Sequence, residues 1–297
     1  MMKILLICNP FAGHGHAGKI LPQVEEALND HGIEFDLQST DYPGHGTELV
    51  RNADLKGYDG LVAAGGDGTL FEVINGYFQN PARVNIPLGI IPVGTGNAFA
   101  RELDLDQSNW KEAIKIIATQ EIRKLDVGKY HSNGQDYYYL NILGLGFVAD
   151  VTRIALKLKW LGNISYTLGV LIRTIFLSAD ELSIEIDGQK LERECTFVEI
   201  SNTRYAANFL MAPYAIIDDG FLDVTIAKKL NRRRLLQCFP KIFTGEHVHL
   251  PEVETWQAKS IKIASAKPKV LSPDGELIGT TPVEIECLKQ TIEVFWK

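Results

Sequence analysis

Short apolar runs alternate with amphipathic segments over the first 120 residues of the chain. The apolar runs lie at residues 3–8, 33–38, 58–64 and 88–91, and each is followed at once by asparagine, serine, glycine or proline. Apolar residues recur at helical spacing over residues 18–31, 45–52, 70–76 and 110–119. This order predicts strand–helix units that build a parallel sheet, with one helix ending near Asn75-Gly76.

From residue 122 onward the pattern becomes strand-like. Apolar and polar residues alternate over 137–142, 182–186, 196–200, 221–226, 283–288 and 291–296. Two helical stretches interrupt these strands, 151–176, with a break near Gly162-Asn163, and 231–243. We therefore predict an α/β domain over residues 1–125. A mainly β domain, either a β-sandwich or a bent antiparallel sheet, should cover 126–297, with a last strand that returns to the hinge.

Composition narrows the class of protein. The net charge of −7 argues against nucleic-acid binding, because nucleic-acid-binding proteins favour a basic surface. The four cysteines are scattered and show no Cys-x-x-Cys spacing, so neither a zinc site nor a disulfide framework is predicted. No run approaches the roughly 20 apolar residues that a membrane-spanning helix needs. We expect a cytoplasmic protein with reduced cysteines that visits a membrane surface transiently.

Two glycine-rich segments follow predicted strands of the first domain. Gly65-Gly66-Asp67-Gly68-Thr69 joins the strand at 58–64 to the helix at 70–76, and the segment from Pro92 to Arg101 follows the strand at 88–91. Glycines let a ligand approach the main chain, and free N–H groups at the start of a helix form an anion site. Two roles fit Asp67: a ligand of Mg²⁺ on bound phosphates, or a helix cap in a tight turn.

The loop after the first strand fits two further phosphate-binding patterns. Gly13-x-Gly15-x-x-Gly18 matches the dinucleotide fingerprint, and Gly13-x-x-x-x-Gly18-Lys19 matches a P-loop. Ile20 replaces the serine or threonine of a P-loop, which disfavours that reading. His14 and His16 either contact phosphate or lie exposed in this loop.

The two glycine-rich segments together resemble the catalytic domain of diacylglycerol kinases and sphingosine kinases, and most of all the small soluble, YegS-like bacterial lipid kinases. The resemblance implies an open α/β sheet of the NAD kinase and diacylglycerol kinase type, followed by a β-sandwich with inserted helices. It also implies ATP as co-substrate and a catalytic Mg²⁺ at Asp67. The ATP-binding positions that it implies are Asn9, Thr40, Gly65, Gly66, Asp67, Gly68, Thr69, Leu70, Phe71, Glu72, Gly94, Thr95, Gly96 and Asn97.

Two later markers occur in the order that the resemblance implies. Asp219 matches an acid that binds a structural Mg²⁺ beside the carbonyls of Ile216 and Phe221, although a plain Asp-Gly hairpin turn has the same sequence. Asp274-Gly275-Glu276 matches a turn that carries the catalytic base. Either Asp274 or Glu276 would take the proton of the acceptor hydroxyl as it attacks the γ-phosphate.

Other features of the second domain leave more than one interpretation. Asp150, which follows Gly146-Phe147-Val148-Ala149, either faces a lipid headgroup or caps a helix. The helices at 151–176 would line an acyl-chain pocket or form the domain core. The arginines at 232–234 would dock on anionic lipid or form a solvated face. His247 and His249 alternate on a predicted strand and, without a third ligand, predict no metal site.

The resemblance leads us to expect an ATP-dependent lipid kinase that transfers the γ-phosphate to the hydroxyl of a membrane lipid such as diacylglycerol. Its partners would be ATP and a lipid at the membrane surface, with a homodimer left open. A sphingoid-base kinase, an NAD kinase-like phosphotransferase and a non-catalytic nucleotide-binding module remain alternatives. An NAD-dependent oxidoreductase built on Gly13-x-Gly15-x-x-Gly18 is the weakest of them.

Overall fold

The computed structural model describes residues 2–158 and 164–297 and divides into two compact units. Unit 1 comprises Met1–Leu125 and Gln290–Lys297, and unit 2 comprises Asp126–Lys289. The predicted helix break near Gly162-Asn163 lies outside the described residues. In the part of the chain that the structure describes, no helix has both the length and the hydropathy that a bilayer crossing requires.

Unit 1 is built on a parallel sheet. Its strands, in spatial order, are β2 (Ile33–Ser39), β1 (Met2–Cys8), β3 (Gly60–Gly65), β4 (Leu88–Pro92) and the end of β16 (Val283–Phe295). The register aligns Cys8 with both Ser39 and Ala64, and Gly65 with Pro92. The carboxyl ends of β1, β2, β3 and β4 therefore lie along one edge, where open α/β sheets bind ligands.

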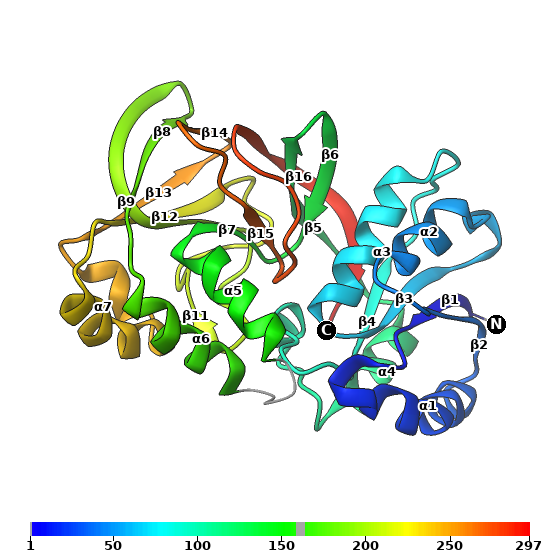
Figure 1. Cartoon of the computed structure of the whole chain (residues 1–297). Helices are drawn as coiled ribbons and strands as arrows, with labels where there is room; N and C mark the ends of the chain where they lie inside the picture. The colour runs from blue at the N-terminus through cyan, green and yellow to red at the C-terminus, as the bar shows by residue number, and fades with distance from the viewer. Residues whose placement is uncertain (1, 159–163) are drawn as a thin grey trace. The chain divides into compact units, whose positions relative to one another are not determined.

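Helices cover both faces of this sheet. They are α1 (Ala12–Asp30), α2 (His45–Asn52), α3 (Asp67–Gln79) and α4 (Trp110–Thr119), with short 3-10 turns η1 (Leu55–Gly57) and η2 (Phe99–Leu103). α1 and α4 share one apolar core with β1, in which Ile4, Leu6, Val24, Leu28 and Ile114 are buried. Figure 1 shows α2 and α3 together on the opposite face.

α3 continues past Asn75-Gly76, so the predicted helix end at that pair is wrong. A Cβ on Gly76 would lie 2.7 Å from both the Thr47 carbonyl oxygen and Val50 Cβ of α2. Asn75 is buried and donates from Nδ2 to the Phe71 carbonyl at 2.8 Å. This glycine therefore lets two helices approach closely, and that requirement outweighs its tendency to end a helix.

Unit 2 is a β-sandwich-like domain with inserted helices. Its remaining strands are β5 (Ile122–Ser132), β6 (Gln135–Tyr139), β7 (Ile142–Gly146), β8 (Asp180–Ile186), β9 (Gln189–Ser201), β10 (Tyr205–Ala206), β11 (Phe209–Leu210), β12 (Leu222–Lys228), β13 (Val253–Ala258), β14 (Ser260–Ser265) and β15 (Leu271–Pro273). The long strand β9 pairs with β8 along its first half and with both β7 and β12 along its second half.

The helices of unit 2 gather beside these strands, as Figure 1 shows. They are α5 (Phe147–Lys157), α6 (Ile164–Ile175) and α7 (Arg232–Cys238), with 3-10 turns η4 (Phe239–Phe243) and η5 (Glu246–His249). α5 packs on β7, β9 and β15, while α6 packs against both α5 and α7. The predicted helix at 231–243 is therefore a short α-helix followed by a 3-10 turn.

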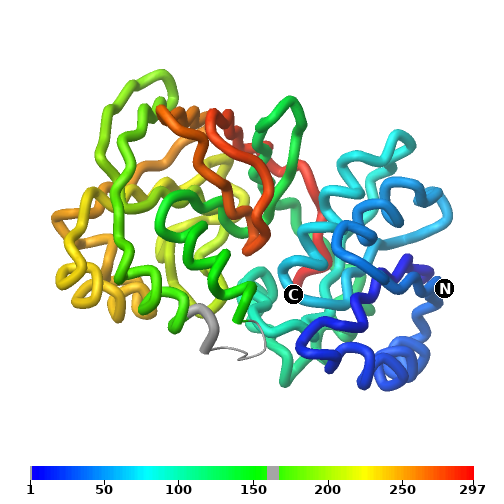
Figure 2. The backbone as a smooth tube through the Cα atoms, in the orientation of Figure 1, coloured from blue at the N-terminus to red at the C-terminus, as the bar shows by residue number. Residues whose placement is uncertain are grey.

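Three strand predictions in unit 2 are wrong in detail. The alternation at 137–142 breaks after Tyr139, because the backbone of Leu140 to Ile142 turns to bind the Asp274 carboxylate. β16 is one strand rather than two, and it runs from unit 2 into unit 1, in red in Figure 2. His247 and His249 lie in a 3-10 turn that follows Gly245, which has a left-handed φ of 76°.

We expect Gly76→Ala to destabilise the protein by about 1–3 kcal/mol, because the new methyl group would overlap backbone and Cβ atoms of α2. Urea denaturation of the variant measures the loss. Gly57→Ala is the matched control, since a Cβ there meets no atom within 4 Å. A Gly76→Ala protein as stable as the wild type would show that the helices can separate at no cost.

Candidate active site

The strand ends of unit 1 bring the predicted nucleotide-binding residues to one edge. Asn9 follows β1 and donates its N–H to the Ala64 carbonyl at 3.0 Å, and Thr40 follows β2 and donates to the Cys8 carbonyl at 2.8 Å. Asn9 Oδ1 in turn accepts the N–H of Phe11 at 3.0 Å. These bonds fix the ends of three adjacent strands, so Asn9 lies beside the segment after β3 and Thr40 lies two strands away along the same edge.

The two glycine-rich segments pack against each other with almost no space between them. The N–H groups of Val93 and Gly94 both donate to the Gly65 carbonyl, each at 3.0 Å. A Cβ on Gly94 would lie 2.3 Å from Gly66 Cα. Asn97 adopts a left-handed φ of 51° and donates from Nδ2 to the Gly94 carbonyl at 2.8 Å. Close backbone approach therefore requires glycine at 94 and leaves little space for a side chain at 66, where a Cβ would lie 3.2 Å from Gly94 Cα.

Asp67 connects these two segments. It is the first residue of α3, and its Oδ1 accepts the N–H groups of Ala98 at 2.7 Å and Phe99 at 3.4 Å. Burial raises the pKa of Asp67 to about 6, while the backbone donors and the charge of Arg101 act in the opposite direction. In this structure the carboxylate therefore holds the second segment onto the helix that follows the first.

The start of α3 divides the predicted ATP-binding positions into two groups. The N–H of Leu70 donates to the Gly66 carbonyl at 3.1 Å, and the side chains of Leu70 and Phe71 lie in the core. Asp67, Gly68 and Thr69 are the first three helical residues, whose N–H groups have no partner within a helix. The predicted positions with backbone donors that could face a ligand are therefore 67–69, together with the exposed Thr95 and its partly exposed neighbour Gly96.

Glu72 has a structural contact that the sequence did not predict. Its Oε1 accepts the N–H of Gly44 at 2.7 Å and its Oε2 accepts the N–H of Gly46 at 2.8 Å. A Cβ on Gly46 would lie 2.7 Å from Glu72 Oε2. Glu72 therefore fixes the start of α2 and the loop after Thr40.

The loop after β1 has unusual backbone geometry. Gly13, His14 and Gly15 have left-handed φ values of 59°, 61° and 79°. The range of α1 begins at Ala12, but its backbone is regularly helical only after Gly15. A Cβ on Gly13 would lie 2.6 Å from the Val93 carbonyl oxygen. This loop therefore packs on the second glycine-rich segment. His14 is exposed and His16 is partly exposed.

In unit 2, the Asp274-Gly275-Glu276 turn separates the two carboxylates. Asp274 is 7% exposed, and its carboxylate accepts the N–H groups of Leu140 at 3.1 Å and of Asn141 and Ile142 at 3.0 Å each. Glu276 is partly exposed, and its N–H donates to the Pro273 carbonyl at 2.8 Å. Asp274 thus joins β15 to the start of β7, whereas Glu276 closes the turn and remains partly exposed.

Acidic groups crowd around the predicted structural Mg²⁺ site. Asp219 Oδ1 accepts the N–H of Phe221 at 2.9 Å, and Oδ2 of the fully buried Asp126 accepts the N–H of Gly220 at 2.6 Å. Burial, and after it the charge of Asp219, raises the pKa of Asp223 to about 6. Among the described residues, no set of three or more His, Cys, Asp and Glu side chains has the geometry of a metal site. Any ion here would need main-chain carbonyls beside Asp219.

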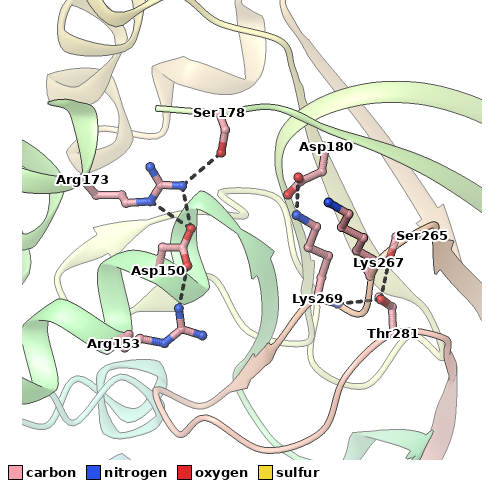
Figure 3. Close-up of polar contacts among 9 residues, drawn as sticks. All are labelled: Asp150, Arg153, Arg173, Ser178, Asp180, Ser265, Lys267, Lys269 and Thr281. Carbon is pink, nitrogen blue, oxygen red and sulfur yellow. Dashed lines mark hydrogen bonds and ion pairs between the residues drawn. The ribbon is translucent and has the colours of Figure 1, made fainter. Parts of the chain in front are cut away.

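Asp150 joins two helices of unit 2, as Figure 3 shows. Its carboxylate contacts Arg153 of α5 at 3.0 Å and Arg173 of α6 at 2.8 Å, and Arg173 also donates to Ser178 at 3.1 Å. In the same view Lys269 contacts Asp180 at the start of β8. Asp150 is therefore an ion-pair partner between α5 and α6.

Comparisons with known proteins agree with this architecture. Residues 3–130 match the model of the diacylglycerol kinase catalytic domain, and residues 141–296 match the YegS C-terminal NAD kinase beta sandwich-like domain. The chain is 32% identical over 297 residues to a diacylglycerol kinase of Mycobacterium tuberculosis (strain H37Rv), covering 98% of this chain and 94% of the relative. It is likewise 32% identical over 297 residues to a diacylglycerol kinase of Bacillus subtilis (strain 168), covering 99% and 96%.

Solved structures show the same fold. A crystal structure of a diacylglycerol kinase from Bacillus anthracis (strain Sterne) matches with a TM-score of 0.74 at 26% identity, covering 99% of this chain and 97% of that one. A second protein from that strain, proposed to be a diacylglycerol kinase, matches with a TM-score of 0.82 at 31% identity and the same coverage. An α/β unit with paired glycine-rich segments, followed by a β-sandwich-like unit, defines a two-domain kinase class. The chain belongs to the diacylglycerol kinase family.

We expect Asp274→Asn to destabilise unit 2 by about 1–3 kcal/mol, because an amide NH₂ would oppose backbone N–H groups that now meet an oxygen. Urea denaturation, combined with hydrogen exchange at Leu140 to Ile142, measures the effect. Glu276→Gln, two residues away, is the control and should stay within about 0.5 kcal/mol of the wild type. Unchanged stability and exchange in Asp274→Asn would contradict the structural role of Asp274.

Proposed function

We propose that the protein is an ATP-dependent lipid kinase that transfers the γ-phosphate of ATP to the hydroxyl of a lipid such as diacylglycerol. The observation that carries this proposal is the pair of glycine-rich segments held together by Asp67, in a chain whose relatives are named diacylglycerol kinases. Phosphoryl transfer depends mostly on positioning and on electrostatic stabilisation of the phosphate oxygens. A rigid set of backbone donors supplies both.

In this proposal the phosphates of ATP bind the N–H groups of Asp67, Gly68 and Thr69 at the start of α3. The positive end of the helix dipole favours anions at this position. Asn97 Oδ1 is buried and has no hydrogen-bond partner among the described residues, so it can accept a donor from the nucleotide. Thr95 would contact phosphate from the second segment, with Asn9 and Thr40 bordering the site.

Asp67 also fits a catalytic Mg²⁺ ion. The hydrogen bonds from Ala98 and Phe99 end on Oδ1, and we therefore assign Oδ2 to the ion. Burial disfavours the ionised carboxylate, and a bound cation would offset that cost. When bound, Mg²⁺ would neutralise charge that develops on the phosphate oxygens. A second, structural ion at Asp219 and the carbonyls of Ile216 and Phe221 is proposed on the crowding of acidic groups there.

We assign the catalytic base to Glu276. As the lipid hydroxyl oxygen attacks the γ-phosphorus, its proton passes to the Glu276 carboxylate and the bond to ADP breaks. Asp274 is less suited to this role, because its carboxylate already accepts three backbone N–H groups. We propose that it instead holds the turn that presents Glu276.

Transfer of labelled γ-phosphate to a panel of acceptors tests the function and its base. Diacylglycerol, monoacylglycerol, sphingosine, ceramide and phosphatidylglycerol are offered in mixed micelles, with NAD in solution. We expect label in a glycerolipid, and we expect Glu276→Gln to lower kcat by about 10²–10⁴-fold, the usual contribution of a general base. The stability control described for Glu276→Gln separates this loss from unfolding.

Label in NAD alone, or in no acceptor despite saturable ATP binding, would contradict the lipid kinase proposal. An active Glu276→Gln enzyme would reject only the assigned base.

We further propose that helices α6 and α7 contact an anionic membrane surface. Five apolar side chains from α6, α7 and the segments that follow them are exposed: Leu171, Ile175, Phe176, Leu236 and Phe243. Arg232 and Arg233 at the start of α7 are exposed as well, whereas Arg234 pairs with Glu252 at 2.7 Å. Apolar side chains flanked by arginines fit a bilayer that contains acidic lipid.

Replacing Arg232 and Arg233 by alanine should weaken binding to phosphatidylglycerol vesicles by about tenfold or more, since each basic residue near such a surface contributes about 1 kcal/mol. Vesicle sedimentation measures the partition coefficient. Alanine at Lys190 and Lys262, two exposed lysines of the same unit, removes equal charge and should change binding little. Equal losses in the two double variants would show that net charge, rather than this surface, controls binding.

A further inference from the structure

One face of β9 carries polar side chains that the proposed mechanism does not use. Phe197, Glu199 and Ser201 alternate along the second half of the strand and therefore share a face. Glu199 is aligned with Gly144 of β7. A Cβ on Gly144 would lie 3.1 Å from Val148 of α5 and 3.6 Å from Glu199 Cγ. Glu199 thus lies on the side of the sheet that α5 covers.

Glu199 is buried with incomplete hydrogen bonding. The residue is 4% exposed, and its Oε2 has no hydrogen-bond partner among the described residues. Ser201 is 0% exposed, and its Oγ has no partner in the same part of the chain. Folded proteins satisfy nearly all buried polar groups, so two such atoms on one face require an explanation. A bound molecule with polar atoms would supply their partners.

Burial raises the pKa of Glu199 to about 8, so most of the carboxyl groups carry a proton at pH 7. The facing residues from neighbouring elements are Gly144 of β7, Thr225 of β12 and Val148 of α5, which do not ionise. Asp223, aligned with Ser201, is a titratable neighbour on this face. Glu199 can therefore act as a hydrogen-bond donor.

Polar and apolar groups follow one another on this face in the same order as in an acylglycerol. Phe197 packs against an apolar cluster from the helices and the segment before α7: Phe147, Val151, Val170, Leu230 and Leu235. In the other direction Gly144 is aligned with Ser272, two residues before Asp274. Two strand spacings place Glu199 about 10 Å from Ser272. The strand that leads into the Asp274–Glu276 turn, the buried acid and the apolar cluster thus follow one another as hydroxyl, ester and acyl chain do in an acylglycerol.

We propose that Glu199 recognises the acceptor lipid by donating a hydrogen bond from its carboxyl group to an ester carbonyl of an acylglycerol, with the acyl chains directed toward the α5–α6–α7 cluster. This inference rests on the proposed lipid kinase function and specifies its acceptor class. Ser201 Oγ would bond the same ester or its neighbour. A sphingoid base fits less well, because its ammonium group would require an ionised carboxylate, which burial disfavours.

Binding and kinetics of Glu199 variants test this inference. Binding of a fluorescent diacylglycerol in mixed micelles is measured without nucleotide, and KM and kcat are measured with ATP. We expect Glu199→Ala to raise both the Kd and the KM for diacylglycerol about tenfold, while kcat and the KM for ATP change less than about twofold. Glu199→Gln keeps a donor and should stay within about threefold of the wild type. Glu192→Ala, an exposed position on the same strand, is the control.

The pH dependence supplies a second readout that a merely structural role would not produce. Below a pKa of about 8 the Glu199 carboxyl is protonated and can donate, and above it the group ionises and loses its donor. The KM for diacylglycerol should therefore rise between pH 7 and pH 9 in the wild type. It should stay flat in Glu199→Gln, whose amide does not titrate in this range.

The outcomes separate the inference from the function on which it rests. A wild-type enzyme that phosphorylates diacylglycerol, with Kd, KM and pH profile unchanged in both variants, would overturn the role of Glu199 and leave the lipid kinase proposal intact. A wild type that phosphorylates no lipid would overturn the proposed function, and the nucleotide-free binding assay would still decide whether Glu199 contacts lipid. Should Glu199→Ala fail to fold, the Gln variant and the wild-type pH profile decide. If Glu199→Ala raised the KM for sphingosine more than the KM for diacylglycerol, the proposed acceptor class would be overturned.

Discussion

The close backbone approach of the two glycine-rich segments is the constraint on which unit 1 depends. Gly66 and Gly94 leave no space for a side chain between them, and Asp67 fixes the approach by bonding the backbone at Ala98 and Phe99. Because backbone N–H groups cannot be reoriented as side chains can, an anion site made from them is only as accurate as this packing. The parallel strands bring the segments to one edge, and Asp67 then sets their separation.

Carboxylates also hold backbone loops elsewhere in the chain. In unit 2, Asp274 accepts three backbone N–H groups more than 130 residues earlier in the chain, and Asp126 accepts the N–H of Gly220. In unit 1, Glu72 accepts the N–H groups of two glycines in the same way. Charge-assisted bonds to backbone donors are stronger than neutral ones, which suits a carboxylate to holding a loop. An acidic residue in a sequence motif can therefore have either of two roles. Its carboxylate can bind a ligand, or it can hold a loop through backbone N–H groups, as Asp274 does.

The sequence was sufficient where the signal is local. Helical periodicity predicts α2 and α4 with the observed bounds, and the apolar runs predict β1, β2, β3 and β4 to within two residues. It was insufficient where a distant group decides the conformation, as at Gly76, which meets α2, and at Leu140 to Ile142, which meet Asp274. Glu199 belongs to no sequence motif. The available signal is that it is the one acid in residues 196–201, whose other side chains are apolar or carry a hydroxyl group. The structure shows that this strand is paired on both sides.

In the proposed function the two units need different chemistry for their ligands. Phosphates are strongly hydrated anions, so a site for them must offer many fixed donors, and the first turn of α3 with its neighbouring loop can do so. An uncharged lipid ester offers only weak acceptors and a large apolar surface, so an ionised group near it would be costly. Burial that keeps Glu199 protonated would meet this requirement, because it provides a donor without a charge. Burial of Asp67, by contrast, leaves a carboxylate whose ionised form gains from a cation, which is the property that a nucleotide with Mg²⁺ requires. In the proposed function, desolvation of a carboxyl group would thus suit unit 2 to a neutral acceptor and unit 1 to a charged phosphoryl donor.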